Sequence, residues 1–368
     1  AGLVPAYRET VEECFSSGLL KAVFATETLS LGINMPARTV VIERFTKFGS
    51  AGKAALTSGE YAQLTGRAGR RGHDAEGHAV VVFGAETPLG EAARVALAPP
   101  PDLRSSFRPT YNLAVNLVAR FDRSRAHRVL RSSFAQWQAR GGERSELLTD
   151  ALDKRLGVLE DLGYVVDWSL SDGGRRLSRI YHERDLLVAE ALRAGVLDGA
   201  EPAILAGVLS AVVFERRRAR RGTAALRRTA TSSVRRRHGD RLGEARRAEL
   251  SERLKALRDH YDRLRGLEEL HQVPKTPEPE AGAATSVAAW ARGAPFGLAL
   301  EVAAAEVGEI APGDFVRTIR QLADLVHQVG LVASDASTVG SARSARDLLL
   351  RDVVAAGTPT ASAIGRGV

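Results

Sequence analysis

Short apolar runs that alternate with helical spacing predict an α/β unit at the start of the chain. Amphipathic helices are expected over residues 6–20 and 58–64, the second with Ser58 as its N-cap. Apolar runs that are typical of buried strands occupy residues 21–25, 39–43 and 79–83. Residues 46–57, which are rich in Gly and Lys, are expected to form a loop between these elements.

Helical spacing dominates the rest of the chain. Residues 84–102 are small and include several prolines, which predicts a linker. Helices are expected over residues 111–118, 129–137, 147–162, 185–193, 202–221, 250–267, 284–305, 313–330 and 343–356. Residues 164–168 and 176–180 flank Ser171–Gly174, which predicts a β-hairpin with a Gly-rich turn. Helices followed by a hairpin outline a winged helix, although other small α+β domains share that outline.

Arginine supplies almost all of the positive charge. The 368 residues carry a formal net charge of +8 but only six lysines. An anionic partner, with nucleic acid first, explains this charge, and the codon bias of a GC-rich genome explains it equally well. The Arg-rich run 216–247 either attracts RNA without sequence preference or is a solvated segment. Residues 271–283 have the Pro/Glu composition of a linker.

The remaining composition narrows the class of protein. The single cysteine, Cys14, excludes a disulfide framework and a cysteine zinc site, and the histidines show no ligand spacing, so no metal site is expected. No signal peptide and no run of eighteen apolar residues is visible, so we expect a soluble, intracellular protein with no membrane partner. Its expected location is the cytoplasm, and we expect it to be a monomer. Trp168 and Trp290 are expected to be core residues rather than platforms for bases.

The densest chemistry lies in Gln63–Gly72, which holds three arginines and three glycines in ten residues. Arginine offers a rigid fork of donors that suits phosphate, and glycine lets backbone approach a ligand closely. A polar loop, residues 25–37, follows the apolar run at 21–25. Since parallel sheets place phosphate sites at their edges, these segments predict such a site. The alternative is a solvated Arg turn with surface ion pairs.

These two segments resemble motifs of the superkiller-type DExH-box helicases of superfamily 2, and within them the bacterial HelY-like branch. Ala25–Ala37 is similar to motif V, and Gln63–Gly72 is similar to motif VI. The resemblance continues through Phe107–Leu113, Arg131–Phe134, Leu177–Tyr181, Glu183–Leu187, Gly313–Arg317 and Ile364–Val368. It extends over nearly the whole chain.

The resemblance implies a fold of α/β followed by mostly α. Residues 1–87 would be a partial second RecA-like lobe, residues 102–181 a winged-helix domain that mainly braces the lobes, and residues 182–368 a C-terminal helical bundle with a ratchet-like helix. No Gly-Lys-Ser/Thr phosphate loop and no Asp-Glu-x-His motif occurs, and Gly49–Ala54 has the wrong spacing for one. The segment after Trp137 is also too short for the arch-like insertion of many relatives.

The resemblance further implies which residues face a nucleotide. Arg70 would be the arginine finger, Arg67 a neighbouring phosphate contact, and Gln63 would orient the γ-phosphate or the attacking water. Gly32 and Asn34 would line the nucleotide side. ATP and Mg²⁺ would be held mainly by an N-terminal RecA-like lobe of the same protein that this sequence lacks, so the isolated chain is expected to be inactive.

Nucleic acid would follow a separate path. Thr26 would contact the backbone of the strand, although a loop in which its hydroxyl satisfies local backbone is the alternative. Arg317 and Arg320 on the ratchet-like helix would contact phosphates, although ion pairs with Asp314 and Asp324 explain them equally well. The expected function is therefore that of an ATP-dependent helicase moving 3′ to 5′ on RNA. The alternatives are a non-catalytic nucleic-acid-binding scaffold derived from a helicase, and a DNA helicase.

Overall fold

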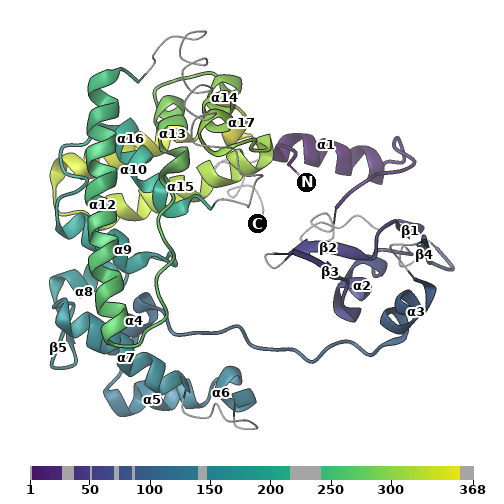
Figure 1. Ribbon diagram of the computed structural model, residues 1–368, viewed down its shortest axis with the longest axis horizontal. Coiled ribbons are helices and arrows are strands. Elements are labelled where there is room, and N and C mark those ends of the chain that lie inside the picture. The colour runs from purple at the N-terminus through teal and green to yellow at the C-terminus, as the bar shows by residue number, and fades with distance from the viewer. Residues whose placement is uncertain are drawn as a thin grey trace, which may run out of the picture. The chain divides into compact units, whose positions relative to one another are not determined.

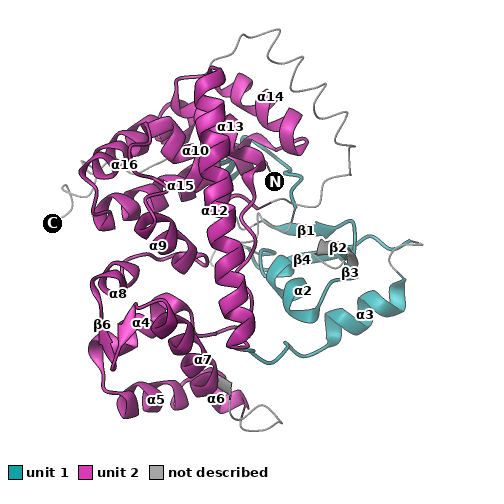
Figure 2. Cartoon of the chain, turned by 60° about the vertical axis from the view of Figure 1, so that its left-hand side comes forward, with its two compact units in different colours: residues 1, 5–104 teal, residues 2–4, 105–368 magenta. Residues whose placement is uncertain are grey.

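The computed structural model describes residues 2–26, 37–49, 52–69, 74–84, 88–139, 147–215 and 242–356. The chain divides into two compact units, which Figure 2 colours separately: unit 1 contains residues 1 and 5–104, and unit 2 contains residues 2–4 and 105–368. Most elements are helices and a few are short strands (Figure 1). In outline this agrees with the expected fold of α/β followed by mostly α. Among the described helices, none combines the length and the apolar character that a membrane crossing needs.

Unit 1 is built on a parallel pair of strands. Its elements are α1 (Pro5–Ser16), β1 (Thr39–Ile42), β2 (Thr46–Gly49), β3 (Gly52–Ala55), α2 (Ser58–Thr65), β4 (His78–Val81) and α3 (Leu89–Leu97). Strands β1 and β4 run parallel, with Thr39 opposite His78 and Ile42 opposite Val81. Strands β2 and β3 form an antiparallel hairpin in which Thr46 lies opposite Ala55.

Among the described residues of unit 1, apolar side chains cover one face of the parallel pair. Ile42 lies in a small buried cluster with Phe45, Leu56, Ala92 and Val95. On the other face, Val41 and its neighbour Val80 are 60% and 46% exposed. Parallel strands are normally buried on both faces, so the exposure of Val41 and Val80 on β1 and β4 is unusual.

The structure confirms the strands expected at 39–43 and 79–83 and the helices at 6–20 and 58–64, with ends that differ by a few residues. The strand expected at 21–25 is wrong, because no described strand pairs with it and Phe24 is 98% exposed. The N-cap of α2 is Thr57, whose hydroxyl accepts from the N–H of Glu60, and not Ser58.

Two further expectations for unit 1 are corrected. The expected loop at 46–57 contains the hairpin of β2 and β3, because its alternating residues pair across strands. The expected linker at 84–102 contains α3, since Ala92 and Val95 lie three residues apart and bury the same helical face. The small residues of this segment are compatible with a helix, because alanine is a strong helix former.

Unit 2 is almost entirely helical. It comprises α4 (Tyr111–Arg120), α5 (Arg123–Arg131), α6 (Phe134–Ala139), α7 (Leu147–Asp161), β5 (Val165–Val166), β6 (Ser169–Leu170), α8 (Asp172–Leu177), α9 (Asp185–Arg193), α10 (Pro202–Val213), α12 (Glu244–Leu270), η2 (Ala281–Ala283), α13 (Ala284–Ala291), α14 (Phe296–Val307), α15 (Pro312–Val332), α16 (Ala336–Leu349) and α17 (Asp352–Ala355). Three expected helices, at 129–137, 284–305 and 343–356, are each split into two.

The expected hairpin exists but is displaced. Strands β5 and β6 pair with Val166 opposite Ser169, so the turn is Asp167–Trp168 and not Ser171–Gly174. Both turn residues have positive φ, 47° and 60°, as a two-residue hairpin turn of type I′ demands. Ser171 instead caps α8 by accepting from the N–H of Gly174, so residues 176–180 continue a helix and its C-terminal turn rather than a second strand.

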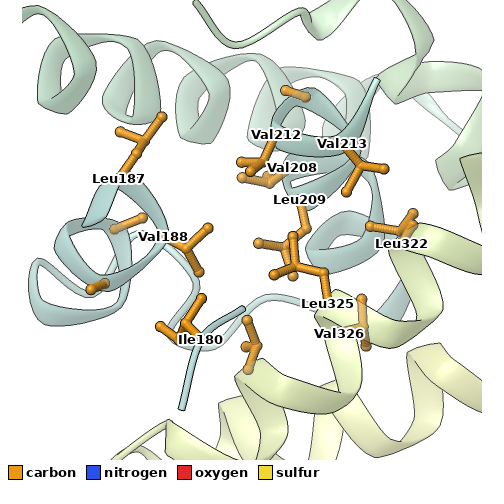
Figure 3. Packing of buried hydrophobic residues seen from close by; sticks show 14 of the residues in the cluster. Ile180, Leu187, Val188, Val208, Leu209, Val212, Val213, Leu322, Leu325 and Val326 are labelled. Carbon is orange, nitrogen blue, oxygen red and sulfur yellow. The ribbon is translucent and has the colours of Figure 1, made fainter. Parts of the chain in front are cut away.

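Helix α10 is the centre of unit 2. Every residue from Ala203 to Val213 is buried, and such all-round burial needs neighbours on every side. Helices α12, α13, α15 and α16 pack against it. Figure 3 shows Val188 of α9 and Leu325 of α15 directed toward the side chains of α10. Trp290 of α13 is fully buried and its ring N–H donates to the Leu349 carbonyl, so it is a core residue as expected.

The contrast between the units leads to a prediction. A fragment containing residues 105–368 should unfold cooperatively on heating, because its core surrounds α10 on all sides. A fragment containing residues 1–104 should bind the dye ANS and lack a sharp transition, because one face of β1 and β4 is open. Circular dichroism and dye fluorescence of the two purified fragments test this. Cooperative unfolding of the 1–104 fragment without dye binding would contradict it.

Candidate functional site

Helix α2 leads into the Arg/Gly turn and is fixed firmly at its start. Thr57 and Glu60 form a reciprocal capping box, in which the Glu60 carboxylate accepts from the Thr57 N–H at 2.9 Å. Lys47 of β2 pairs with the same carboxylate. Partial burial acts to raise the pKa of Glu60, but the hydrogen bonds from Lys47 and Thr57 outweigh it and lower that pKa. The cap therefore joins α2 to the β2–β3 hairpin.

The turn itself is held against the end of the polar loop. The Ala37 N–H donates to the Arg67 carbonyl at 2.9 Å, and the Gly69 N–H donates to the Ala37 carbonyl at 2.8 Å. Gly69 has a φ of 86°, which favours glycine. A Cβ placed on Gly77 would lie 2.6 Å from the Ala68 carbonyl, so backbone passes very close here. Residues 67–69 are thus fixed as a neighbour of the chain entering β1.

The expected nucleotide residues are placed only in part. Gln63 lies in the last turn of α2 and is exposed, and Arg67, four residues on, is half-buried. Gly32, Asn34 and Arg70 lie outside the described residues. The described portion therefore presents an amide and a guanidinium at one end of α2, which is a donor set suited to phosphate oxygens.

The expected nucleic-acid residues differ in their surroundings. Thr26 is exposed. Arg317 of α15 is exposed and donates to Asp314 at 2.6 Å, the ion pair that the sequence offered as the alternative. Arg320, by contrast, donates to the backbone carbonyls of Val354, at 2.9 Å, and Ala356. Arg320 therefore holds the last turn of α17 to α15.

Asn112 joins two of the segments that carry the resemblance. Its side-chain amide donates to the carbonyls of Leu177, Ser178 and Ile180 at 2.9–3.2 Å. Its backbone N–H donates to the Asp185 carboxylate at 2.7 Å. The start of α4 and the end of α8 are consequently held together by this half-buried side chain.

Arg184 performs the same task between α9 and α10. It is only 4% exposed and donates to the carbonyls of Val212, Pro277 and Glu278. Glu268 of α12, which is fully buried, accepts from the Tyr111 hydroxyl and from the Thr276 N–H. The segment at 271–283, expected to be a linker, is therefore pinned to the core by hydrogen bonds on both sides of Thr276.

The sequence patterns did not mark these structural polar residues. Arg184 and Asp185 lie in Glu183–Leu187, one of the segments that resemble the helicase family, but no role was expected of them. Asn112 gave a usable signal, because an asparagine within an apolar helical stretch has to satisfy its amide. The partners of Arg184 gave none, since backbone carbonyls carry no side-chain identity.

Comparison with known proteins agrees with this architecture. The model of the DSHCT (NUC185) domain matches residues 167–356, which is just over half of the chain, and the model of the helicase conserved C-terminal domain matches residues 2–72. The second match includes both segments that meet at Ala37 and Arg67.

Several curated proteins are similar to the chain. Probable helicase HelY of Mycobacterium tuberculosis (strain ATCC 25618 / H37Rv) is 54% identical over 165 residues, which is 43% of this chain and 18% of that protein. Superkiller complex protein 2 of Homo sapiens is 39% identical over 172 residues, 45% of this chain and 14% of that protein. Antiviral helicase SKI2 of Saccharomyces cerevisiae is 38% identical over 162 residues, 44% of this chain and 12% of that protein. The match thus spans less than a fifth of each of these relatives.

The Arg184 contacts predict a strict need for arginine. Arg184→Lys should lower the free energy of unfolding of unit 2 by roughly 2–4 kcal/mol, because one ammonium cannot reach carbonyls on α10 and on residues 277–278 together. Chemical denaturation monitored by circular dichroism measures it. The exposed Arg179→Lys is the matched control and should be neutral. Equal stability of the two variants would show that the contacts are dispensable.

The two arginines of α15 should separate in stability. Arg320→Ala should lower Tm because the carbonyls of Val354 and Ala356 lose their donor. Arg317→Ala should leave Tm nearly unchanged, since an exposed ion pair contributes about 0–1 kcal/mol. Differential scanning calorimetry of both variants makes the comparison, and an equal loss of Tm would contradict it.

Asp185 makes stability depend on pH in an unusual direction. Burial raises the pKa of its carboxyl from 3.8 to about 6, despite the N–H groups of Asn112 and Leu186 that favour the ionised form. The pKa of Asp185 in the folded state exceeds its pKa in the unfolded state. The stabilisation of the fold by the protonated carboxyl is therefore fully present below about pH 4 and is lost as pH rises through about 6. The stability cost of Asp185→Asn should therefore shrink by roughly 1–3 kcal/mol between pH 4 and pH 7. Denaturant unfolding at both values tests this, and a cost that grows with pH would refute it.

Proposed function

The chain belongs to the family of superkiller-type DExH helicases, as a C-terminal portion of such a protein, and from this premise we propose that it forms part of an ATP-dependent RNA helicase. The proposed activity couples ATP hydrolysis to 3′-to-5′ movement along RNA. The observation that carries the proposal is the pair of backbone hydrogen bonds between Ala37 and residues 67 and 69. They bring the end of the segment similar to motif V against the segment similar to motif VI.

The turn would act on the phosphates of ATP. Bound ATP supplies the γ-phosphoryl group that is transferred to water. Arg70, which follows the fixed residues 67–69, would stabilise negative charge on that group, and Arg67 would contact a neighbouring phosphate. Gln63 would orient the γ-phosphate or the water. Gly32 and Asn34 would face the same nucleotide from the polar loop.

The other half of the site would come from an N-terminal RecA-like lobe of the same protein. The sequence contains neither a Gly-Lys-Ser/Thr loop nor an Asp-Glu-x-His motif. We assign Mg²⁺ to that lobe, which would supply a carboxylate to the ion alongside the phosphates of ATP. The exposed Val41 and Val80 support the same arrangement, because further elements of a RecA-like sheet would cover them.

We divide the chain into three functional parts. Residues 1–87 would be the partial second RecA-like lobe, and residues 102–181 a winged-helix domain whose wing is the β5–β6 hairpin. Residues 182–368 would be a helical bundle that guides the strand, with α15 as its ratchet-like helix. Thr26 and Arg317 are exposed, and for a phosphate contact Arg317 would exchange its pairing with Asp314 for a phosphate. Arg320 would have to leave the carbonyls of Val354 and Ala356 first. We place the helicase in the cytoplasm as a monomer.

RNA is preferred over DNA because one relative, from Arabidopsis thaliana, is named as a DExH-box ATP-dependent RNA helicase. A DNA helicase and a non-catalytic scaffold are the rivals. Competition between RNA and DNA strands in an unwinding assay distinguishes an RNA helicase from a DNA helicase. Hydrolysis of ATP by the longer protein distinguishes a helicase from a non-catalytic scaffold.

The proposal predicts the effect of removing the finger. In a longer protein that includes the N-terminal lobe, Arg70→Ala should lower RNA-stimulated ATP hydrolysis about 10³-fold or more while RNA affinity stays within a few-fold. Arg94→Ala, an exposed arginine of α3, is the matched control and should keep full activity.

Two results would overturn the proposal. One is RNA-stimulated hydrolysis of ATP by the isolated 368 residues, since the phosphate loop would then be unnecessary. The other is an equal loss of hydrolysis and RNA binding in Arg70→Ala, which would give the arginine a structural role.

A further inference from the structure

Residues Gly2–Val4 lead directly into α1, yet they fold with unit 2. Figure 2 colours them with that helical unit, whereas α1, which begins at Pro5, belongs to unit 1. Val4 is only 6% exposed and is a member of the main core of unit 2. No role assigned so far explains why three residues that match the helicase conserved C-terminal domain are anchored in the helical unit.

The carbonyl of Gly2 caps the start of α15. The first N–H groups of a helix have no partner within the helix, and Ala311, the N-cap of α15, has no side chain that can accept from them. Pro312, the first helical residue, has no N–H. The next N–H, that of Gly313, donates to the Gly2 carbonyl at 2.8 Å. The segment before α1 therefore supplies the acceptor that the N-cap of α15 lacks.

This contact is so close that it favours glycine on both sides. A Cβ on Gly313 would collide with the backbone carbonyl of Leu3. A Cβ on Gly2 would lie 2.7 Å from the Ala311 Cβ, and Gly2 has a φ of 79°, which also favours glycine. The Leu3 side chain is 53% exposed. The anchor therefore consists of the backbone of residues 2 and 3 and the buried side chain of Val4.

The chain connects the two units twice, and the two connections differ in length. At the first, the buried Val4 is followed directly by Pro5, the first residue of α1. At the second, residues 98–110 contain no helix or strand, are mostly exposed, and separate α3 from α4. A long irregular segment absorbs a displacement by changing its own conformation. A single peptide bond between an anchored residue and a helix passes the displacement on.

The anchored end of α15 is also the end that carries Arg317. Arg317 follows Gly313 by about one helical turn, or roughly 6 Å along the axis. Its side chain is exposed, and the proposed function gives it a phosphate contact. A shift of the start of α15 therefore moves this guanidinium with it, because a helix behaves as a rigid element over one turn.

We propose that Gly2–Val4 couples the RecA-like lobe to α15, with Val4 and Gly313 as positioning residues that pass a displacement of α1 to Arg317. The inference rests on the proposed function, because hydrolysis of ATP in the lobe is the source of the displacement. It adds the physical link between the nucleotide and a residue that contacts the strand. Such coupling requires an element whose position both sites bias, and α15 is that element.

The anchor is tested in the complete 368-residue chain, by hydrogen–deuterium exchange at the start of α15. Val4→Ala removes buried apolar contacts, and Gly313→Ala places a methyl group against the Leu3 carbonyl. Both should raise the exchange rate of the N–H of residue 313 about tenfold or more. Circular dichroism confirms that the variants are folded.

Two variants are matched controls for the exchange measurement. Leu3→Ala shortens the exposed neighbour of Val4. Gly297→Ala changes the second residue of α14, as Gly313→Ala changes the second residue of α15, but its Cβ would meet nothing within 4 Å. In both controls the N–H of Gly313 should exchange as it does in the unaltered chain.

The coupling is tested in the longer protein that includes the N-terminal lobe. Insertion of Gly-Ser-Gly-Ser between Val4 and Pro5 leaves the anchor intact but gives slack to the connection. RNA-stimulated hydrolysis of ATP should stay within about twofold, while the base pairs unwound per ATP hydrolysed should fall about fivefold or more. The same insertion between Asp102 and Leu103, in the longer connection, is the matched control and should leave unwinding per ATP unchanged.

Every outcome counts for or against the coupling. Unchanged exchange in both Val4→Ala and Gly313→Ala would show that residues 2–4 do not hold α15. Full unwinding per ATP after the insertion at Val4, or an equal loss after the insertion at Asp102, would show that the displacement does not pass through this segment. Equal loss of hydrolysis and unwinding would make the segment structural only. These results leave the proposed function standing, whereas a lack of hydrolysis in the unaltered longer protein removes both.

Discussion

A parallel pair of strands needs apolar cover on both faces. The described residues of unit 1 cover one face of the pair formed by β1 and β4. Ile42 and Phe45 belong to its small core, whereas Val41 and Val80 point away from it. That constraint links the fold to the proposed function. The backbone of residues 67–69 is hydrogen-bonded to Ala37 at the entrance to β1, so elements that complete the sheet would also set the position of the Arg/Gly turn. Completing the core and completing the nucleotide site are then one event.

In unit 2 the constraint is different, because many helices have to be held in fixed positions relative to one another. Apolar contacts around α10 give most of the stabilisation but little directional information. Polar side chains supply the direction. The half-buried Asn112 ties α4 to the end of α8, and the buried Arg184 ties α9 to the carboxyl end of α10. Each has side-chain donors paired with carbonyls, which offsets the cost of removing these polar groups from water. A rigid unit 2 would suit the proposed role of guiding a strand.

The sequence predicted the elements whose signals are local. Apolar runs located β1 and β4, and helical spacing located α4, α7, α9 and α15. It failed where distant residues decide. The alanine-rich segment of α3 was expected to be a linker, but it forms a helix that packs against α2. Residues 176–180 were expected to form a strand, but Ser171 caps the helix α8, which continues into them. The meeting of Ala37 with residues 67–69 agrees with the expected shared site, while the roles of Arg67, Arg70, Gly32 and Asn34 stay predictions. Arg320 shows the limit most clearly: its charge suggested phosphate, and its actual partners are backbone carbonyls.

The central claim is that an arginine of the Arg/Gly turn stabilises the transferring phosphoryl group of a nucleotide held by another lobe. The most direct measurement compares the affinity of the longer protein for ADP alone with its affinity for ADP plus aluminium fluoride, a mimic of the transferring group. The unaltered protein should bind the mimic complex at least about a hundredfold more tightly than ADP, and Arg70→Ala should lose this preference while it still binds ADP. If Arg70→Ala retains the full preference, the turn does not serve as the arginine finger and the account is contradicted.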